Sequence, residues 1–185
     1  MTAEASAKKL STAYSEISVL ASKMLKLYIA KLYPSETPHD AAMRALDMAL
    51  SDTYGKRLSD FQLKKTQSGK PFFAGCDNIK FNISHSGDYS VAALSDSDVG
   101  VDIERIRPVN PRIADRFLRG IATGTSYDKI IEAWCKKESY GKFTGAGLLG
   151  ADFSLPHHIQ VFDFVPGYKI AVCSVKKQTA EIILF

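Results

Sequence analysis

Two acidic residues separated by a single residue, Asp102 and Glu104, are the strongest chemical signal in the sequence. They lie in the short apolar run 99–104, and in a β-strand successive side chains point to opposite faces of the sheet. The apolar residues of the run would then share one face, and the two carboxylates the other. Carboxylates on one face repel unless a cation or solvent intervenes, and such oxygen pairs suit Mg²⁺. The alternative is a solvated sheet edge whose acids only prevent pairing.

A second charged group lies on a helix that the sequence predicts from about 127 to 143. Trp134, Glu138 and Lys142 follow one another at intervals of four, so they stack along one side of that helix. By itself, this spacing predicts an ordinary surface ion pair between Glu138 and Lys142, worth about a few tenths of a kcal/mol.

A histidine between two serines, at 84–86, ends a strand that is predicted to begin at Ile79. Apolar and polar residues alternate along this strand, as expected when one face is buried. Hydroxyls, backbone N–H groups and the His85 imidazole together can form a cradle for an anion. The alternative is a His85 that is simply solvated. A serine-hydrolase site is excluded, because the nucleophile elbow needs a glycine before the serine.

Two basic residues lie on earlier elements. Lys70 stands in the turn 67–71, whose proline favours an extended backbone at the residue before it. Arg44 lies on a helix predicted from 41 to 48, which Asp40 can cap. Most helical arginines are solvated, so the spacing alone assigns Arg44 no chemical role.

Other elements must support these residues. Apolar positions at intervals of three and four predict one or two amphipathic helices over 5–33. A short helix is expected at 112–118. The C-terminal part predicts three antiparallel strands with a Pro-Gly turn between the first two, at 158–164, 168–175 and 181–185.

Length and composition bound the possibilities. A chain of 185 residues with 45% hydrophobic and 24% charged residues is typical of one folded domain or two small subdomains sharing a core. No run approaches the about 18 apolar residues that span a bilayer, and no secretory signal is visible. We therefore expect a cytoplasmic protein with no membrane partner. The net charge of +4 is too mild for a dedicated nucleic-acid binder.

Four motifs occur in the order typical of one family. They are Gly-Lys-Pro at 69–71, Phe-Asn-Ile-Ser-His-Ser-Gly at 81–87, Gly-Val-Asp-Ile-Glu at 100–104, and Trp-x-x-Lys-Glu-Ser-Tyr-x-Lys-x-x-Gly-x-Gly-Leu at 134–148. With these motifs, the chain from about His39 to Val175 resembles the 4′-phosphopantetheinyl transferases of the surfactin-synthetase type.

The resemblance implies an α+β fold in which two similar α+β subdomains pack as a pseudo-dimer. The boundary would fall near Asp98, giving an N-terminal subdomain over 1–98 and a C-terminal subdomain over 99–185 that carries the metal site. A monomer is expected.

The resemblance also implies a reaction. The phosphopantetheine arm of coenzyme A would be transferred to a serine of an acyl or peptidyl carrier protein, with Mg²⁺ or Mn²⁺ as cofactor and adenosine 3′,5′-bisphosphate released. Glu138 and Lys142 would be catalytic. The metal ligands would be Asp102, Glu104 and Glu138, Lys142 would contact the coenzyme's phosphates, and its nucleotide end would be held by Arg44, Lys70, Ser84 and His85.

Three features depart from the family pattern. Ala122 stands where many members have an acidic residue, the segment before Trp134 is several residues shorter, and residues 1–33 match poorly. The first two motivate an alternative: a coenzyme A or carrier-binding protein of the same fold that has lost turnover.

Overall fold

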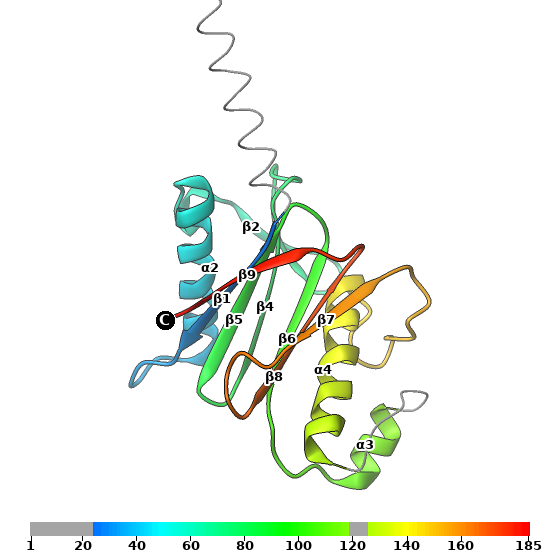
Figure 1. Ribbon diagram of the computed structural model, residues 1–185. Helices are drawn as coiled ribbons and strands as arrows, with labels where there is room; N and C mark the ends of the chain where they lie inside the picture. Colours follow the sequence, from blue (N-terminus) through cyan, green and yellow to red (C-terminus); the bar gives the residue numbers. More distant parts are fainter. Residues whose placement is uncertain (1–23, 119–125) are drawn as a thin grey trace, which may run out of the picture.

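The computed structural model of the protein describes residues 24–118 and 126–185. Figure 1 shows a mixed α+β architecture, which confirms that part of the expected fold class. The helices are α2 (Pro38–Tyr54), α3 (Pro111–Phe117) and α4 (Tyr127–Thr144), with a short 3₁₀ turn, η1 (Leu58–Asp60). The strands are β1 (Met24–Lys31), β2 (Leu63–Lys65), β3 (Pro71–Phe73), β4 (Lys80–Ser86), β5 (Tyr89–Ser95), β6 (Val99–Arg105), β7 (His158–Phe162), β8 (Tyr168–Ser174) and β9 (Thr179–Leu184).

The strands form two main sheets, with orders β4-β5-β1-β9 and β6-β8-β7, and a small β2-β3 hairpin. Helix α2 covers the outer face of the first sheet, and α4 covers the outer face of the second. The molecule is therefore layered as helix, sheet, sheet, helix (Figure 1). Such an arrangement lets each sheet bury both of its faces.

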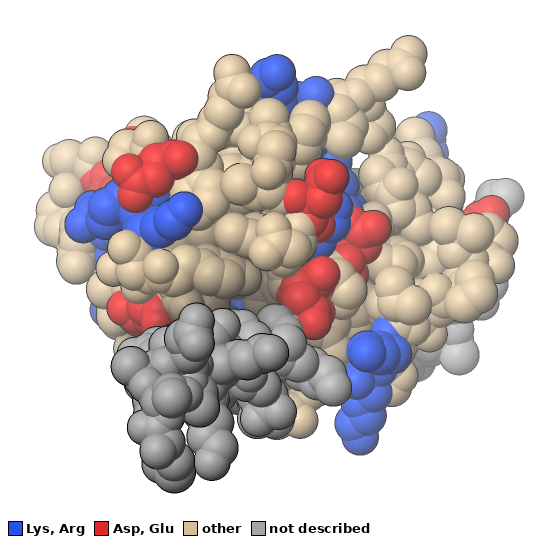
Figure 2. All heavy atoms as spheres, turned by 90° about the horizontal axis from the view of Figure 1, so that it is seen from above, with Lys and Arg blue, Asp and Glu red and all other residues tan. Residues whose placement is uncertain are grey.

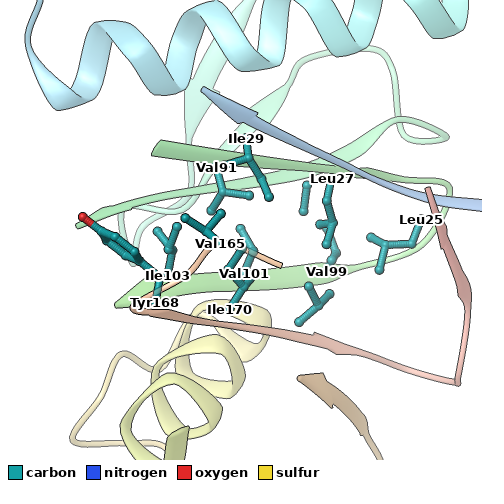
Figure 3. Packing of buried hydrophobic residues seen from close by; sticks show 12 residues of the cluster. Leu25, Leu27, Ile29, Val91, Val99, Val101, Ile103, Val165, Tyr168 and Ile170 are labelled. Carbon is teal, nitrogen blue, oxygen red and sulfur yellow. The ribbon is translucent and has the colours of Figure 1, made fainter. Parts of the chain in front are cut away.

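The inner faces of the two sheets meet in one hydrophobic core (Figure 3). Successive side chains of a strand point to opposite faces of the sheet, so every second residue of each strand points toward the facing sheet. The apolar face predicted for β6 is confirmed. The contributing side chains are Leu25, Leu27 and Ile29 of β1, Val91 and Ala93 of β5, Val99, Val101 and Ile103 of β6, and Val165, Tyr168, Ile170 and Val172.

Helix α2 extends the helix predicted at 41–48 and begins with a different cap. Thr37 accepts a hydrogen bond from the backbone N–H of Asp40, so Thr37 is the N-cap and Asp40 lies in the first turn. Pro38 suits this start, since its missing N–H would be unpaired there. Gly55 ends the helix in a left-handed conformation, with φ of 64°.

The prediction of helix over 5–33 is wrong for its last part, because 24–31 form strand β1. Leu25, Leu27 and Ile29 alternate toward the inter-sheet core, while Tyr28 faces α2. Both a period of two and a period near 3.6 fit these apolar residues, and pairing with β5 and β9 selects the strand. Residues 1–23 of that prediction lie outside the described residues.

All three predicted C-terminal strands are present, but only the first two of them pair with each other. Strands β7 and β8 are antiparallel, joined through a turn in which Gly167 has a φ of 79°. Strand β9 instead runs parallel to β1 in the first sheet. The C-terminal strand thus crosses the boundary expected near Asp98, and the division at 98 and the pseudo-dimer symmetry stay predictions.

Charged side chains on the face seen in Figure 2 form small separate groups of both signs among uncharged residues. This distribution agrees with the mild net charge of +4. No helix in the described ranges is both long and apolar enough to cross a membrane.

Candidate active site

Asp102 and Glu104 lie on strand β6 where it runs beside β4, at the boundary between the two main sheets. Asp102 is 2% exposed, and its Oδ1 accepts a hydrogen bond of 2.8 Å from the Ser84 hydroxyl. Glu104 Oε2 accepts one of 2.8 Å from the Ser86 hydroxyl. The alternative of a solvated sheet edge is therefore wrong for Asp102.

Helix α4 approaches β6 closely because residue 100 is glycine. A Cβ atom on Gly100 would overlap the backbone of Ser139 and Phe143 in the helix. Any larger residue would push α4 away from the strand. This close approach places Glu138 and Lys142 beside Asp102.

Lys142 links the acids of both elements. Its Nζ lies 2.7 Å from Asp102 Oδ1, 2.8 Å from Ser84 Oγ and 3.7 Å from Glu138 Oε2. The other Glu138 oxygen accepts a hydrogen bond of 3.2 Å from the Trp134 indole. The predicted spacing of four is thus confirmed, while Glu138 and Lys142 belong to a partly buried network that includes Asp102 rather than to an isolated surface pair.

The three carboxylates share one electrostatic environment. Burial raises the pKa of Asp102 and Glu104, and the Lys142 ammonium and the serine hydroxyls oppose that increase. Burial also raises the pKa of Glu138, with a further increase from the negative charge of Asp102. Added positive charge would oppose the increase in pKa of each acid.

We call Asp102, Glu104 and Glu138 the carboxylate cluster. Asp102 Oδ2 is buried and has no hydrogen-bond partner among the described residues. Across 24–118 and 126–185, no three acidic, histidine or cysteine side chains already stand in metal-ligating geometry; Lys142 is in contact with two of the acids. An unpartnered oxygen among hard carboxylate donors nevertheless fits the chemistry of Mg²⁺ or Mn²⁺.

A groove with a volume of about 250 Å³ lies next to Lys142, between the turn that contains Lys70, strand β4 and the end of α4. The Lys70 ammonium donates a hydrogen bond of 2.9 Å to the Phe143 carbonyl oxygen. Burial lowers the pKa of Lys70. The structure thus brings two predicted coenzyme-binding lysines, 72 residues apart in sequence, to one groove.

A smaller hollow of about 130 Å³ opens on the other side of the carboxylate cluster. Glu104 and Trp134 line it together with the start of the connector after β6, at Arg107, Val109 and Asn110. Of the three acids, Glu104 lines this hollow, whereas Lys142, which contacts the other two acids, lines the groove.

Ser84 and His85 do not face the same side, because neighbours on a strand alternate. Ser84 is buried toward β6, whereas His85 is exposed. His85 pairs in register with Ser90, whose hydroxyl donates to the carbonyl of Pro38 at the start of α2. The local cradle of hydroxyl and imidazole expected from the sequence is therefore not formed.

Arg44 is held in an ion pair away from the carboxylate cluster. Its guanidinium donates two hydrogen bonds to Glu36, of 2.9 and 2.8 Å, and one of 2.8 Å to the Lys31 carbonyl. It also lies 4.0 Å from the centre of the Tyr33 ring. We call Arg44, Glu36 and Tyr33 the arginine clamp. Sequence spacing did not pair Arg44 with Glu36, which is eight residues away across a loop.

Ser86 contacts a predicted metal ligand and was missed as a site residue. The alternation along 79–84 was a usable signal, since it continues to Ser86 and places it on the face of Ser84. Ala122, where the chain departs from the family pattern, lies outside the described residues.

Known proteins with similar sequences belong to one family of enzymes. The family model described as "4′-phosphopantetheinyl transferase, N-terminal" matches residues 41–97. The 4′-phosphopantetheinyl transferase ffp of Bacillus subtilis is 31% identical over 83% of this chain and 81% of its own length. The chain belongs to the 4′-phosphopantetheinyl transferase family.

Two further family members match over most of the chain. The transferase Sfp of Bacillus subtilis strain 168 is 29% identical over 83% of this chain and 81% of its own. The transferase psf-1 of Bacillus pumilus is 28% identical over 71% and 68%. The resemblance inferred from the four motifs is thereby confirmed, and the chain belongs to a family of enzymes of the transferase class.

Proposed function

We propose that the protein transfers the 4′-phosphopantetheine arm of coenzyme A to a serine hydroxyl of an acyl or peptidyl carrier protein. Membership in the transferase family supports this activity. The observation that carries the proposal is the carboxylate cluster next to a groove with two lysines. Adenosine 3′,5′-bisphosphate is the product that leaves.

Asp102, Glu104 and Glu138 would hold the divalent cation. A bound Mg²⁺ would neutralise negative charge on the coenzyme's pyrophosphate. The buried, unpartnered Asp102 Oδ2 supports this assignment, because a carboxylate oxygen is costly to bury without a partner. Lys142 contributes a second positive charge within the cluster.

Lys70 and Lys142 line the same groove, so we assign them to the coenzyme's phosphates. A phosphate bound there would receive charge-assisted hydrogen bonds from both ammonium groups. Lys70 already donates to a backbone carbonyl at the end of α4, which fixes its position before the coenzyme binds.

Glu138 is the candidate general base for the carrier serine. It comes from α4, whereas Asp102 and Glu104 come from β6, and it accepts a hydrogen bond from Trp134, which lines the smaller hollow. Burial and the charge of Asp102 raise its pKa in the metal-free site, and a carboxylate within reach of the serine hydroxyl can act as a general base. Proton removal from the serine would then accompany attack on the β-phosphorus.

The nucleotide end was assigned by resemblance to four residues, and this assignment stays a prediction. Lys70 and the exposed His85 are free of carboxylate partners among the described residues, whereas Ser84 donates to Asp102 and Arg44 pairs with Glu36. Dephospho-coenzyme A, which lacks the 3′-phosphate, should bind more weakly than coenzyme A. If His85→Ala leaves the affinity for both molecules unchanged, His85 has no part in holding that phosphate.

Intact-mass measurement of a carrier protein tests the activity. Incubation with coenzyme A and Mg²⁺ should add one phosphopantetheine group to the carrier, and chelation of the metal should prevent it. A panel of fatty-acid, polyketide and peptide carriers covers the substrate classes. Tight binding of coenzyme A without any mass increment on this panel would favour the binding protein without turnover.

A further inference from the structure

Strand β4 faces β6 with three polar side chains at alternate positions, Asn82, Ser84 and Ser86. Asn82 Oδ1 accepts a hydrogen bond of 2.9 Å from the backbone N–H of Val101. Ser84 donates to Asp102 over 2.8 Å. Strands β4 and β6 belong to different sheets and exchange no backbone hydrogen bonds of a β-ladder. Hydrogen bonds made by the side chains of β4 therefore hold β6 beside it.

Ser86 makes the last contact of this series. Its hydroxyl donates to Glu104 Oε2 over 2.8 Å and accepts the N–H of Arg105 over 3.1 Å. A serine hydroxyl has one proton to donate, and here that proton is directed to a carboxylate. Ser86 is half-buried, so solvent competes only partly for these bonds.

We propose that Ser86 is a positioning residue that orients Glu104 toward the other two acids of the carboxylate cluster. The backbone bond to Arg105 fixes the serine hydroxyl, and the hydroxyl in turn fixes one oxygen of Glu104. With Oε2 fixed, the direction of the other carboxylate oxygen, Oε1, is restricted as well. Groups that orient metal ligands in this way commonly change metal affinity by about 10- to 100-fold when removed. The inference deepens the proposed function and rests on it.

Two other roles for Ser86 are less compatible with these contacts. A hydroxyl that binds a phosphate must donate its proton to it, and this proton is already given to Glu104. A phosphate at this point would also lie against a carboxylate, which repels it. A purely structural hydroxyl would affect folding and leave the metal affinity unchanged.

Titration of the full chain with Mn²⁺, followed by the electron paramagnetic resonance signal of the free ion, tests this role without coenzyme or carrier. Ser86→Ala should raise the dissociation constant about tenfold, and Ser86→Thr, which keeps the hydroxyl, should restore most of the affinity. Ser174→Ala is the matched control, because it also removes one serine hydrogen bond, to the Lys176 carbonyl in the turn between β8 and β9. It should leave the Mn²⁺ affinity unchanged.

A double variant shows whether Ser86 acts through Glu104. In a Glu104→Ala background, Ser86→Ala should cause no further loss of Mn²⁺ affinity, and thermal melting checks that each variant is folded. Equal affinities for wild type and folded Ser86→Ala, an additive loss in the double variant, or a wild type without Mn²⁺ binding would each overturn the inference. Failure of the carrier mass assay would overturn the proposed activity alone, since this titration does not depend on turnover.

Discussion

The carboxylate cluster and the arginine clamp both hold charged side chains at buried or partly buried positions, but they differ in how fully the carboxylates are paired. In the clamp, both oxygens of Glu36 are paired, by Arg44 and by the backbone N–H of Tyr33. In the cluster, the single ammonium of Lys142 contacts two of the three acids, and Asp102 Oδ2 has no partner among the described residues.

The pKa directions express the same contrast. Hydrogen bonds from Arg44 and the Tyr33 backbone lower the pKa of Glu36 to about 2, whereas burial raises that of every acid in the cluster. In the clamp the Glu36 carboxylate is fully paired without a ligand, although Arg44 Nη1 is buried with no hydrogen-bond partner among the described residues. The cluster lacks positive charge, so it suits a cation that arrives from solution. Four substitutions test this distinction.

The largest expected effect is the loss of transfer in Asp102→Asn. The substitution keeps the size of the side chain and removes the charge in contact with Lys142. We expect turnover to fall by about a thousandfold, the upper range for loss of one charge-stabilising group. Intact-mass kinetics and circular dichroism on the same sample provide the measurement. A folded variant with normal Mg²⁺-dependent turnover would remove Asp102 from the site.

Glu138→Gln should follow, with turnover lower by about two orders of magnitude, the usual scale for losing a general base. The thermal midpoint should change little, because the indole of Trp134 can still donate to the amide oxygen. Steady-state kinetics at saturating Mg²⁺, coenzyme A and carrier measure the effect. Wild-type rates with an intact metal requirement would return Glu138 to the ordinary ion-pair interpretation.

Arg44→Met should lower stability, and its effect on coenzyme A binding decides whether Arg44 has a second role at the nucleotide end. The clamp would lose its ion pair with Glu36 and keep an apolar stem over the Tyr33 ring. We expect the thermal midpoint to fall by a few degrees, about the shift for 1 kcal/mol in a domain of this size. The KM for coenzyme A decides the role: a clear increase would support the assignment of Arg44 to the nucleotide end.

The smallest effect concerns Glu36→Gln and its dependence on pH. The folded pKa of about 2 lies below the ordinary value of 4.5, so the ionised carboxylate favours the folded state. This contribution is complete above pH 4.5 and disappears as the pH falls through 2. The difference in thermal midpoint between wild type and variant should therefore shrink over that interval. A difference that stays constant would mean that the charge of Glu36 contributes nothing.

Sequence patterns were sufficient where one periodicity dominated. The spacing of Glu138 and Lys142, the two-faced strand 99–104 and the helix that carries Arg44 all agree with the structure. Residues 24–31 were mistaken for helix because their apolar residues fit two periods, and only the neighbouring strands select one.

Contacts between distant elements could not be predicted. The parallel pairing of β9 with β1 joins residues about 150 positions apart, and no local pattern encodes it. Burial of Asp102 depends on helix α4, which can approach β6 because residue 100 is glycine. From the sequence of the strand alone, without the helix that covers it, Asp102 looks like a residue of an exposed sheet edge. Ser86 shares the face of Ser84 on β4, but its partner Glu104 is 18 residues away.

Anomalous diffraction from crystals grown with Mn²⁺ and coenzyme A tests the central claim most directly. The account predicts one strong manganese peak within bonding distance of Asp102, Glu104 and Glu138, about 2.0 to 2.3 Å for oxygen ligands of such ions. The coenzyme's phosphates should lie in the groove of Lys70 and Lys142. A manganese peak elsewhere, with Lys142 still bridging Asp102 and Glu138 while coenzyme A is bound, would contradict it.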